Sequence, residues 1–352
     1  MTSIPKLFRK ARRTMRRKLL RNSEKKALEG YVNALGNRDF AAARRAAASP
    51  EMISSLSDLC LSHQGLIGLL DILEESGHRR RVLMRPHNVA GYLSHYHHFF
   101  GGVILPLLEW ASVGVFKDKA DLVVRDCGPM NTELEQWANI CGIRLAIIPQ
   151  VLIAPLAKSG LLEVLDSPGY DFCYREDWYP RELVVDGIRR HVFGIIESDL
   201  QESPLPGPKA VLIVRGKSNP FYGSKVSETA ASGAKRRSIP NLAALTEAMR
   251  EVTPNLHVVY LEEMTVMEKV RMFRDADIVV GQMGAGLNNI LWMPPGAALI
   301  EILSLDTIRR DFSAYANISH RMKVRHRRVI QESDHSEVPI PLLLDFLREF
   351  AS

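Results

Sequence analysis

The hydrophobic positions of the chain fall into short apolar runs separated by stretches with helical periodicity. A short apolar run bounded by turn residues predicts a buried strand, and apolar positions three and four apart predict an amphipathic helix. Strands that alternate with helices imply a parallel sheet. In the N-terminal half, helices are expected over residues 24–75, and buried strands are expected at Arg81–Arg85, Leu122–Val124 and Leu145–Ile148.

The C-terminal half shows the same alternation more regularly. Thr265 stands three residues before Glu268 at the start of one predicted helix, which is the spacing of a capping box. The repeated order of strand and helix is typical of a doubly wound α/β lobe. The expected strands are Ala210–Val214, His257–Leu261, Asp277–Val280 and Ala297–Ile302, and the expected helices are Ile239–Val252, Thr265–Arg274 and Leu342–Phe350.

A turn-rich segment divides the two halves. Residues 201–209 contain three prolines and a glycine, a composition typical of a linker. A chain of 352 residues is also long enough for two domains of ~150 residues each. We therefore expect α/β lobes at 51–200 and 205–335, an arm with a helix at 1–50, and a closing helix at 336–352.

Positive charge is concentrated at the N-terminus. Residues 1–26 hold eleven of the 46 Lys and Arg residues and one acid, Glu24, which leaves 35 basic and 39 acidic residues for the rest of the chain. A nucleic-acid partner is not expected, because phosphate binding needs basic charge spread over the binding face. Apolar residues at helical spacing make residues 1–21 a basic amphipathic helix suited to an anionic membrane surface. A solvated tail and an organellar transit peptide are the alternatives for this arm.

The cysteines and the apolar runs bear on the compartment. Cys60, Cys127, Cys141 and Cys173 show no close pairing, which favours reduced thiols. The longest apolar run, Phe99–Leu108, is shorter than the ~20 residues that span a bilayer. No apolar core follows the early arginines, so a cleaved secretory signal is not expected. The expected location is cytoplasmic and peripheral at a membrane.

A glycine-rich turn is the sharpest chemical signal. The predicted strand at 277–280 runs into Gly281, Gly284 and Gly286 and then into a helix. Such a turn lets main-chain amides approach a phosphate at the start of a helix, although a tight turn without a ligand has the same pattern. Asn289 stands where a dinucleotide fingerprint has its third glycine, and a Walker A lysine is absent.

Charged residues follow the predicted strands at positions where they can meet a ligand. Arg215 and Lys217 come directly after one strand, and Arg236 and Arg237 precede the next helix. A guanidinium matches phosphate oxygens in bidentate fashion, although a surface role is the usual fate of one arginine. Glu301 ends the predicted strand at 297–302, where a carboxylate can bind a sugar hydroxyl or simply cap the loop.

Three histidines lie close together in the first lobe. The three are His95, His97 and His98. An unperturbed histidine has a pKa near ~6.5, so one of them can accept a proton at neutral pH, although packing roles are commoner. His-x-His-His lacks the further ligands of a closed zinc site. The acidic motif Asp275-Ala-Asp277 stands before its strand, at the end opposite the ligand crevice. We therefore expect no metal site.

Three blocks together carry a family resemblance. The segment Met264–Ile302, with its Gly-Ala-Gly core, is the most specific of the three. The weaker blocks are Val211–Lys217, with Arg236, Arg237 and Asn241 downstream, and Tyr96–Phe99, with Leu105-Pro106 downstream. Together they resemble glycosyltransferase family 61, which includes capsular-polysaccharide biosynthesis proteins and xylosyl- and N-acetylglucosaminyltransferases. The resemblance covers roughly residues 80–305.

The resemblance implies an α/β fold of two Rossmann-like lobes that face a cleft, the B type of glycosyltransferase (GT-B). It implies inverting, metal-independent transfer from a nucleotide-sugar, bound by the second lobe, to a glycan or glycolipid acceptor, bound mainly by the first. The nucleotide-sugar is a co-substrate, and no cofactor is expected. On this hypothesis His98 is the general base and Arg215 stabilises the leaving diphosphate. The donor-binding residues are expected to be Lys217, Arg237, Gly284, Ala285, Gly286, Leu287, Asn288 and Glu301.

One position departs from the family pattern. The family commonly has histidine before Gly-Ala-Gly, and Met283 stands there in this chain. A thioether cannot donate a hydrogen bond or carry charge. This departure motivates one alternative function, a non-catalytic glycan- or nucleotide-binding protein of the same fold. A nucleic-acid-binding protein that uses the basic arm is the other alternative.

Overall fold

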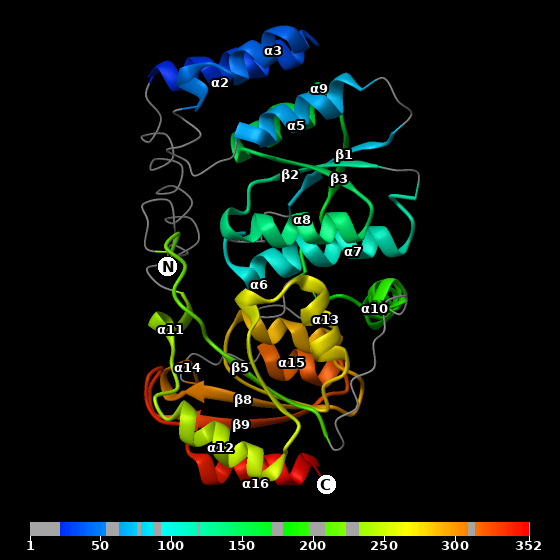
Figure 1. Cartoon of the computed structure of the whole chain (residues 1–352). Helices are drawn as coiled ribbons and strands as arrows, with labels where there is room; N and C mark the ends of the chain where they lie inside the picture. The colour runs from blue at the N-terminus through cyan, green and yellow to red at the C-terminus, as the bar shows by residue number, and fades with distance from the viewer. Residues whose placement is uncertain are drawn as a thin grey trace, which may run out of the picture. The chain divides into compact units, whose positions relative to one another are not determined.

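A computed structural model of the chain shows a mixed α/β protein with two parallel sheets (Figure 1). The described residues form two compact units that interleave along the sequence. The first unit takes residues 1–85, 116–131 and 142–166, and the second takes 86–115, 132–141 and 167–352. The structure describes residues 22–53, 63–75, 79–86, 93–117, 120–170, 179–196, 208–222, 232–308 and 314–351.

The first unit is built on a four-stranded sheet with the order β3-β2-β1-β4. All neighbouring strands are parallel, as the alternation of strands and helices predicts. The three strands expected from apolar runs are confirmed, because their central residues are buried. The strands are β1 (Arg81–Arg85), β2 (Asp121–Arg125), β3 (Arg144–Ile148) and β4 (Glu163–Asp166).

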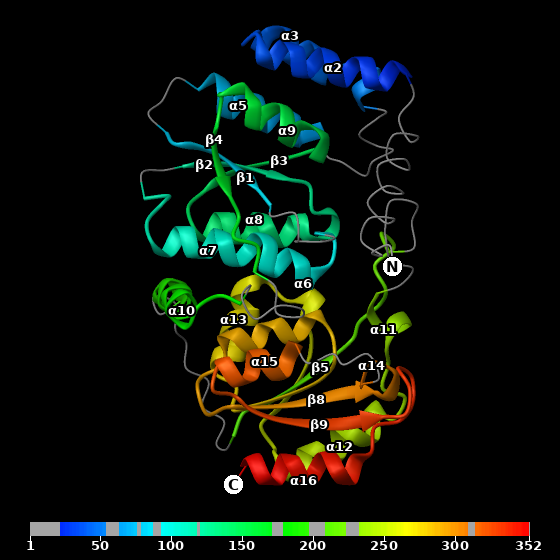
Figure 2. The ribbon, with the colours of Figure 1, turned by 180° about the vertical axis from the view of Figure 1, so that it is seen from behind.

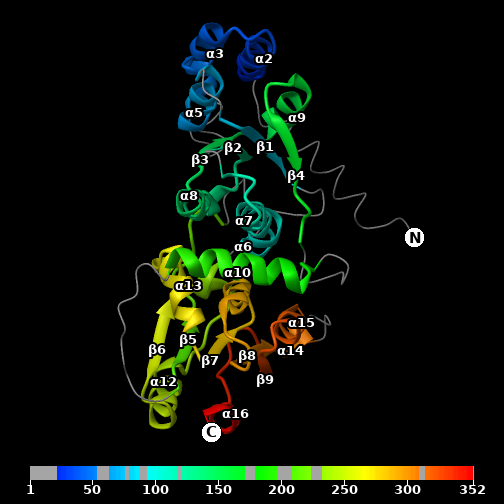
Figure 3. The same ribbon diagram turned by 90° about the vertical axis from the view of Figure 1, so that its right-hand side faces the viewer.

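Two layers of helices cover one face of this sheet (Figure 3). Helices α5 and α9 pack directly on it, and α2 and α3 form a further layer, so that one core joins Leu69, Leu152 and Val123. The predicted helical character of residues 24–75 is confirmed where the structure describes them. The helices are α2 (Asn22–Gly36), α3 (Phe40–Ala47), α5 (His63–Glu74) and α9 (Gln150–Ser159), with a short turn η2 (Gly128–Met130).

The second unit is built on a five-stranded parallel sheet with the order β6-β5-β7-β8-β9. Figure 2 shows β8 and β9 side by side in this sheet. The predicted strands are confirmed to within three residues at each end. The strands are β5 (Ala210–Val214), β6 (Leu256–Tyr260), β7 (Ile278–Gln282), β8 (Ala298–Ser304) and β9 (Arg325–Gln331).

Helices lie on both faces of this sheet, as a doubly wound lobe requires (Figures 1 and 3). On one face α12 (Leu242–Val252) and α16 (Ile340–Ala351) bury an apolar core against the strands. On the other face lie α13 (Val266–Arg274), the 3-10 helix η6 (Ala285–Trp292) and α15 (Ala314–Arg321). The remaining elements are α6 (Tyr96–Phe99), η1 (Phe100–Ile104), α7 (Leu105–Ser112), α8 (Asn131–Ile140), α10 (Glu182–Ile196), α11 (Gly233–Arg236), η5 (Leu261–Glu263) and α14 (Leu305–Ile308).

Two strands lie outside the predicted set, and both are at sheet edges. β4 has two apolar residues, and β9 begins with Arg325-His326-Arg327-Arg328. An edge strand has a neighbour on one side only, so it needs no continuous apolar run. The arginines of β9 instead cover α16, where Arg325 lies over the Phe350 ring at 4.8 Å.

The strand order of the second sheet contains a topological switch point, where the chain changes direction across the sheet. The chain leaves β5 toward β6 on one side, and it later returns through β7 on the other side of β5. The loops that follow β5 and β7 therefore diverge at neighbouring strand ends. In open parallel sheets such a topological switch point is where ligands bind. In this unit it lies after Val214 and Gln282.

The compact units do not follow the predicted ranges. Residues 93–115, 132–141 and 179–196 group with the second unit although they fall within the predicted lobe 51–200. Side chains of α6 and α8 bind residues of the second sheet's helices, as described below. The division into an acceptor-side and a donor-side lobe stays a prediction, and the predicted basic helix at 1–21 lies outside the described residues.

The described residues include two of the four cysteines. Cys127 and Cys141 are free thiols, and burial raises the pKa of each to about 12. Cys60 and Cys173 lie outside the described residues. Within the described ranges no helix is both long and apolar enough to span a bilayer.

The capping box of α13 yields the first prediction. Thr265 N donates to Glu268 Oε2 at 2.7 Å, and Glu268 N donates to Thr265 Oγ1 at 3.3 Å. Thr265→Ala should lower the free energy of unfolding by about 1 kcal/mol, whereas Thr265→Ser should keep it. Tryptophan fluorescence during urea unfolding measures this, because the buried Trp137 and Trp292 belong to the same unit. Equal stability of the alanine and serine variants would contradict the prediction.

Candidate functional site

Two arginines converge on one carbonyl at the switch point of the second sheet. Arg215 follows β5, and its Nη2 donates to the main-chain oxygen of Met283, after β7, at 2.7 Å. Arg237 Nη1 donates to the same oxygen at 3.2 Å. The carbonyl thus holds both guanidinium groups where the two strand ends diverge.

These cations have little negative charge around them. Arg237 pairs with Asp334 at 3.1 Å, and Arg215 forms no ion pair with any residue that the structure describes. Arg215 Nε is also buried without a hydrogen-bond partner among those residues. Burial lowers the pKa of Arg215 to about 10, with Arg237 and Arg236 adding to the effect. An anion bound here would relieve this repulsion.

The glycine-rich turn is shaped by what packs against it. A Cβ atom on Gly284 would lie 1.9 Å from Arg215 Nη2, and one on Gly286 would lie 2.9 Å from Leu261 Cδ1. Gly284 is therefore needed for the approach of the guanidinium. Residues 284–286 remain partly exposed. Leu287 N already donates to Gly284 O at 2.9 Å, so this amide is engaged within the turn.

The histidine segment lies against the same turn. His97 Nδ1 is 3.0 Å from Oδ1 of Asn288, so residues 191 positions apart in the sequence meet in one unit. Asn288 is buried, and its Nδ2 has no partner among the described residues. The structure therefore directs the Asn288 oxygen toward a histidine.

The three histidines form a cluster with aromatic neighbours. The His98 ring centroid lies 6.2 Å from that of His95 and 5.6 Å from that of His97. Burial lowers the pKa of His98 to about 4, with the two other histidines adding to it. His98 is therefore neutral at pH 7 and a weak base. Tyr222 contacts the His95 ring edge-on and donates to Ser94 O at 2.5 Å.

Two groups act electrostatically between the histidines and the arginines. The pKa of His95 is lowered by burial and then by Arg236. The Tyr315 ring lies edge-on to the His97 ring, with 6.5 Å between the ring centroids. Tyr315 also raises the pKa of Arg215, against the lowering by burial. The histidine segment and the glycine-rich turn therefore meet through His97 and Asn288, and Arg236 and Tyr315 lie between the histidines and Arg215 in these interactions.

A buried ion pair between Lys269 and Glu133 holds the histidine segment through Tyr96. Tyr96 OH donates to Glu133 Oε1 at 2.8 Å, and Lys269 Nζ donates to Glu133 Oε2 at 2.7 Å. The ammonium also lies 5.6 Å from the centre of the Tyr96 ring. The side chains of Lys269 and Glu133 are only 10% and 12% exposed. Burial and Glu133 hold the pKa of Tyr96 well above its ordinary value.

Glu133 and Lys269 are not among the site residues predicted from the sequence. Lys269 lies on the buried face of α13, together with Val266, Val270 and Phe273. A lysine at an apolar position of an amphipathic helix is a usable signal, because a buried lysine needs a partner. Glu133 has no local signal, since only the packing of α8 places it there.

Two other predicted residues, Lys217 and Glu301, take no part in these contacts. Lys217 is exposed and makes no hydrogen bond with the described residues. The prediction that Glu301 ends its strand is wrong, because β8 continues to Ser304. Glu301 is fully buried there, and its Oε2 lies 3.0 Å from His326 Nε2 and 3.4 Å from Arg328 Nε. Its pairing partners are thus two basic residues of β9.

No metal cluster is formed by the part of the chain that the structure describes. Asp277 instead accepts from Lys209 N at 2.8 Å, at the amino end of β7, and Asp275 pairs with Arg274. These are roles at element ends. The predicted metal independence stays a prediction.

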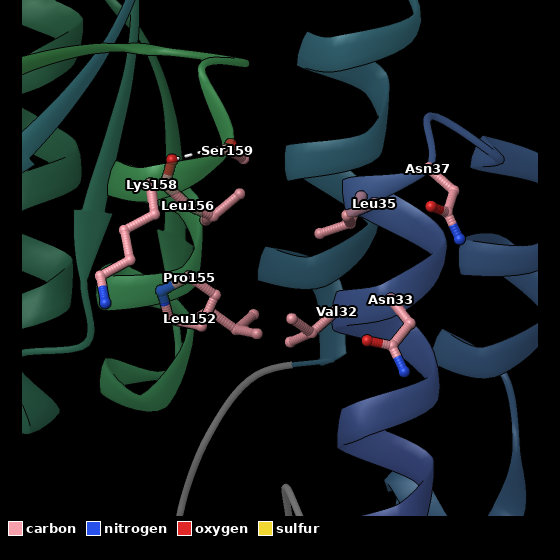
Figure 4. Close-up of a pocket in the computed structure, with 9 residues that line it drawn as sticks. All are labelled: Val32, Asn33, Leu35, Asn37, Leu152, Pro155, Leu156, Lys158 and Ser159. Carbon is pink, nitrogen blue, oxygen red and sulfur yellow. Dashed lines mark hydrogen bonds between the residues drawn. The ribbon is translucent and has the colours of Figure 1, made fainter.

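The first unit contains a separate pocket of about 480 Å³ between α2 and α9. Its apolar side chains, Val32, Leu35, Leu152 and Leu156, point toward one another (Figure 4). Lys158 is its one charged lining residue. The pocket therefore lacks the convergent cations and histidines of the site in the second unit.

A comparison with protein-family models finds a match for the chain. The model described as Glycosyltransferase 61 matches residues 96–300, which is more than half of the chain. The matched range begins at Tyr96 and includes the arginines, the glycine-rich turn and Lys269. None of the curated proteins matches the chain significantly.

The buried pair yields a stability prediction. Lys269→Met leaves Glu133 buried without a counter-charge, which should cost about 3–5 kcal/mol of unfolding free energy. Glu133→Gln combined with Lys269→Met removes both charges and should recover most of that loss. Urea unfolding followed by tryptophan fluorescence measures both variants. A double variant no more stable than the single one would show that the ion pair is not the source of the loss.

Proposed function

The chain belongs to glycosyltransferase family 61, and from this premise we propose that it moves a sugar from a nucleotide-diphosphate donor to a hydroxyl of a glycan or glycolipid. The observation that carries the proposal is the Arg215 guanidinium, held by Met283 O at the switch point without a carboxylate partner among the described residues. Such a group is ready for an anionic ligand. The diphosphate of the donor is the anion that the proposed reaction supplies.

In the proposed reaction the acceptor oxygen bonds to the anomeric carbon while the bond from that carbon to the diphosphate oxygen breaks. Direct displacement of this kind inverts the configuration. Negative charge grows on the leaving diphosphate, and Arg215 and Arg237 are positioned to stabilise it. Fixed guanidinium groups supply this charge without a divalent ion, which is why we propose metal-independent transfer.

The glycine-rich turn supplements the arginines in this proposal. The partly exposed residues Gly284, Ala285 and Gly286 offer main-chain amides beside the guanidinium of Arg215. Lys217, exposed in the loop after β5, would contact the outer phosphate. Glu301 is the weakest of the proposed donor contacts, because β9 already provides its partners.

The methionine at position 283 does not argue against the proposed activity. The contribution of this position to the site is its carbonyl oxygen, which accepts from both arginines. A main-chain atom is present whatever the side chain. The departure from histidine therefore leaves the anion-binding groups in place.

The proposal extends to the whole chain. One parallel sheet in each unit supports the two-lobed GT-B architecture, with the acceptor bound mainly by the first lobe. The basic segment at 1–21 would keep the enzyme at an anionic membrane surface on the cytoplasmic side, near a glycolipid acceptor.

Arg215→Ala tests the central contact. Loss of this guanidinium should lower the rate of sugar transfer by ~10²-fold or more, because it removes stabilisation of the leaving group. Release of nucleoside diphosphate from UDP-N-acetylglucosamine, UDP-xylose or GDP-mannose measures the rate. Arg348→Ala, at an exposed position of α16, is the control and should leave it unchanged. Unchanged turnover in Arg215→Ala would remove the basis of the proposal, and donor binding without turnover in the wild type would favour the non-catalytic alternative.

Gly284→Ala tests the same site without removing a charge. The new methyl group would meet Arg215 Nη2 and displace the guanidinium. We expect weaker binding of inorganic pyrophosphate by calorimetry, by tenfold or more. Gly194→Ala in α10 adds the same atom in open space and should bind as the wild type does. Equal affinities in the two variants would contradict this role of Gly284.

A further inference from the structure

The bond between His97 and Asn288 fixes where the proton of this histidine lies. Asn288 Oδ1 faces His97 Nδ1 at 3.0 Å. An amide oxygen only accepts hydrogen bonds, so Nδ1 carries the proton of the neutral ring. In this tautomer the basic lone pair is on Nε2. Asn288 is 1% exposed, so it is held rigidly while it orients the ring.

We infer that His97, oriented by Asn288, is the general base that removes the proton of the acceptor hydroxyl. The inference rests on the proposed transferase function and replaces His98 in this role. In the step, His97 Nε2 takes the hydroxyl proton while the acceptor oxygen bonds to the anomeric carbon. The electron pair of the broken bond leaves with the diphosphate.

Hydrogen bonding favours His97 over His98. When Nε2 takes up a proton, the bond from Nδ1 to Asn288 Oδ1 becomes charge-assisted and stronger. His98 has ring contacts with His95 and His97 but no hydrogen bond with the described residues. Its pKa is lowered to about 4 by burial and by its histidine neighbours. A proton on His98 would therefore meet no compensating acceptor among those residues.

The position of Asn288 connects the base to the leaving group. Asn288 lies in η6, two residues after Gly286, and Gly284 lies against Arg215. Among the described residues, the titratable groups that face His97 include His95 and His98 on its own segment and Tyr315 on α15. One short element thus orients the base at one end and frames the proposed diphosphate site at the other.

Kinetics of single variants of the full chain test the assignment. Nucleoside diphosphate release from the donors named above is measured with water as the acceptor, and UDP affinity is measured by calorimetry. We expect His97→Gln to lower kcat by ~10²-fold or more, with the Kd for UDP unchanged within twofold. His98→Gln should lose less than tenfold, and His320→Gln, at an exposed position of α15, should lose nothing. A larger loss in His98→Gln than in His97→Gln overturns the inference.

A second pair of measurements separates a base from a structural residue. Asn288→Asp places a carboxylate against Nδ1, so the acid limb of the pH profile of kcat should move up by about one pH unit or more. If the acid limb of this profile did not move and the variant were less stable, Asn288 would have a packing role alone, and the inference would be overturned. Long-range ¹⁵N–¹H spectra of the wild type should show the His97 proton on Nδ1, and a proton on Nε2 overturns the inference without any assay.

The outcomes also separate this inference from the proposed function. A wild type that binds neither UDP nor GDP and releases neither of them from the three donors refutes the transferase and the base together. An active wild type whose His97→Gln variant keeps full kcat refutes the base alone. The unfolding midpoint of each variant, followed by tryptophan fluorescence, identifies any loss that comes from misfolding.

Discussion

The site of this protein depends on one carbonyl oxygen that accepts hydrogen bonds from two guanidinium groups. Met283 O holds Arg215 and Arg237 at the switch point of the second sheet, and Asp334 is the carboxylate that pairs with Arg237. A carbonyl has only a partial charge, so it orders the cations without neutralising them. Burial and the neighbouring arginines lower the pKa of Arg215, and this is the physical reason for proposing an anionic ligand there.

A second constraint is the buried ion pair beneath α6. Lys269 and Glu133 need each other, because a single buried charge would be costly. Glu133 also accepts from Tyr96, and the next residue, His97, binds Asn288. The pair therefore sets where the histidine segment lies relative to η6. In this way the stability of the unit and the geometry of its site come from the same contacts.

Much of the fold follows from local pattern. The apolar runs located β1, β2, β3, β5, β6, β7 and β8, and the spacing of Thr265 and Glu268 located the start of α13. Each of these signals lies within a few residues of sequence. β4 and β9 were not predicted because neither shows a continuous apolar run: β4 has two apolar residues, and β9 begins with four basic residues. Glu301 does not end its strand, because pairing with β9 continues along β8 to Ser304.

Some features of the candidate site follow from the sequence, and others only from the tertiary structure. The sequence by itself determined the Gly-Ala-Gly turn, Arg215 at a strand end and a histidine segment, because glycine freedom and strand ends are local properties. Only the tertiary structure decided that Met283 contributes its carbonyl, that Lys269 meets Glu133, and that Asn288 faces His97 rather than His98. Each of these contacts joins segments far apart in the chain, and side-chain packing, not sequence spacing, selects the partner.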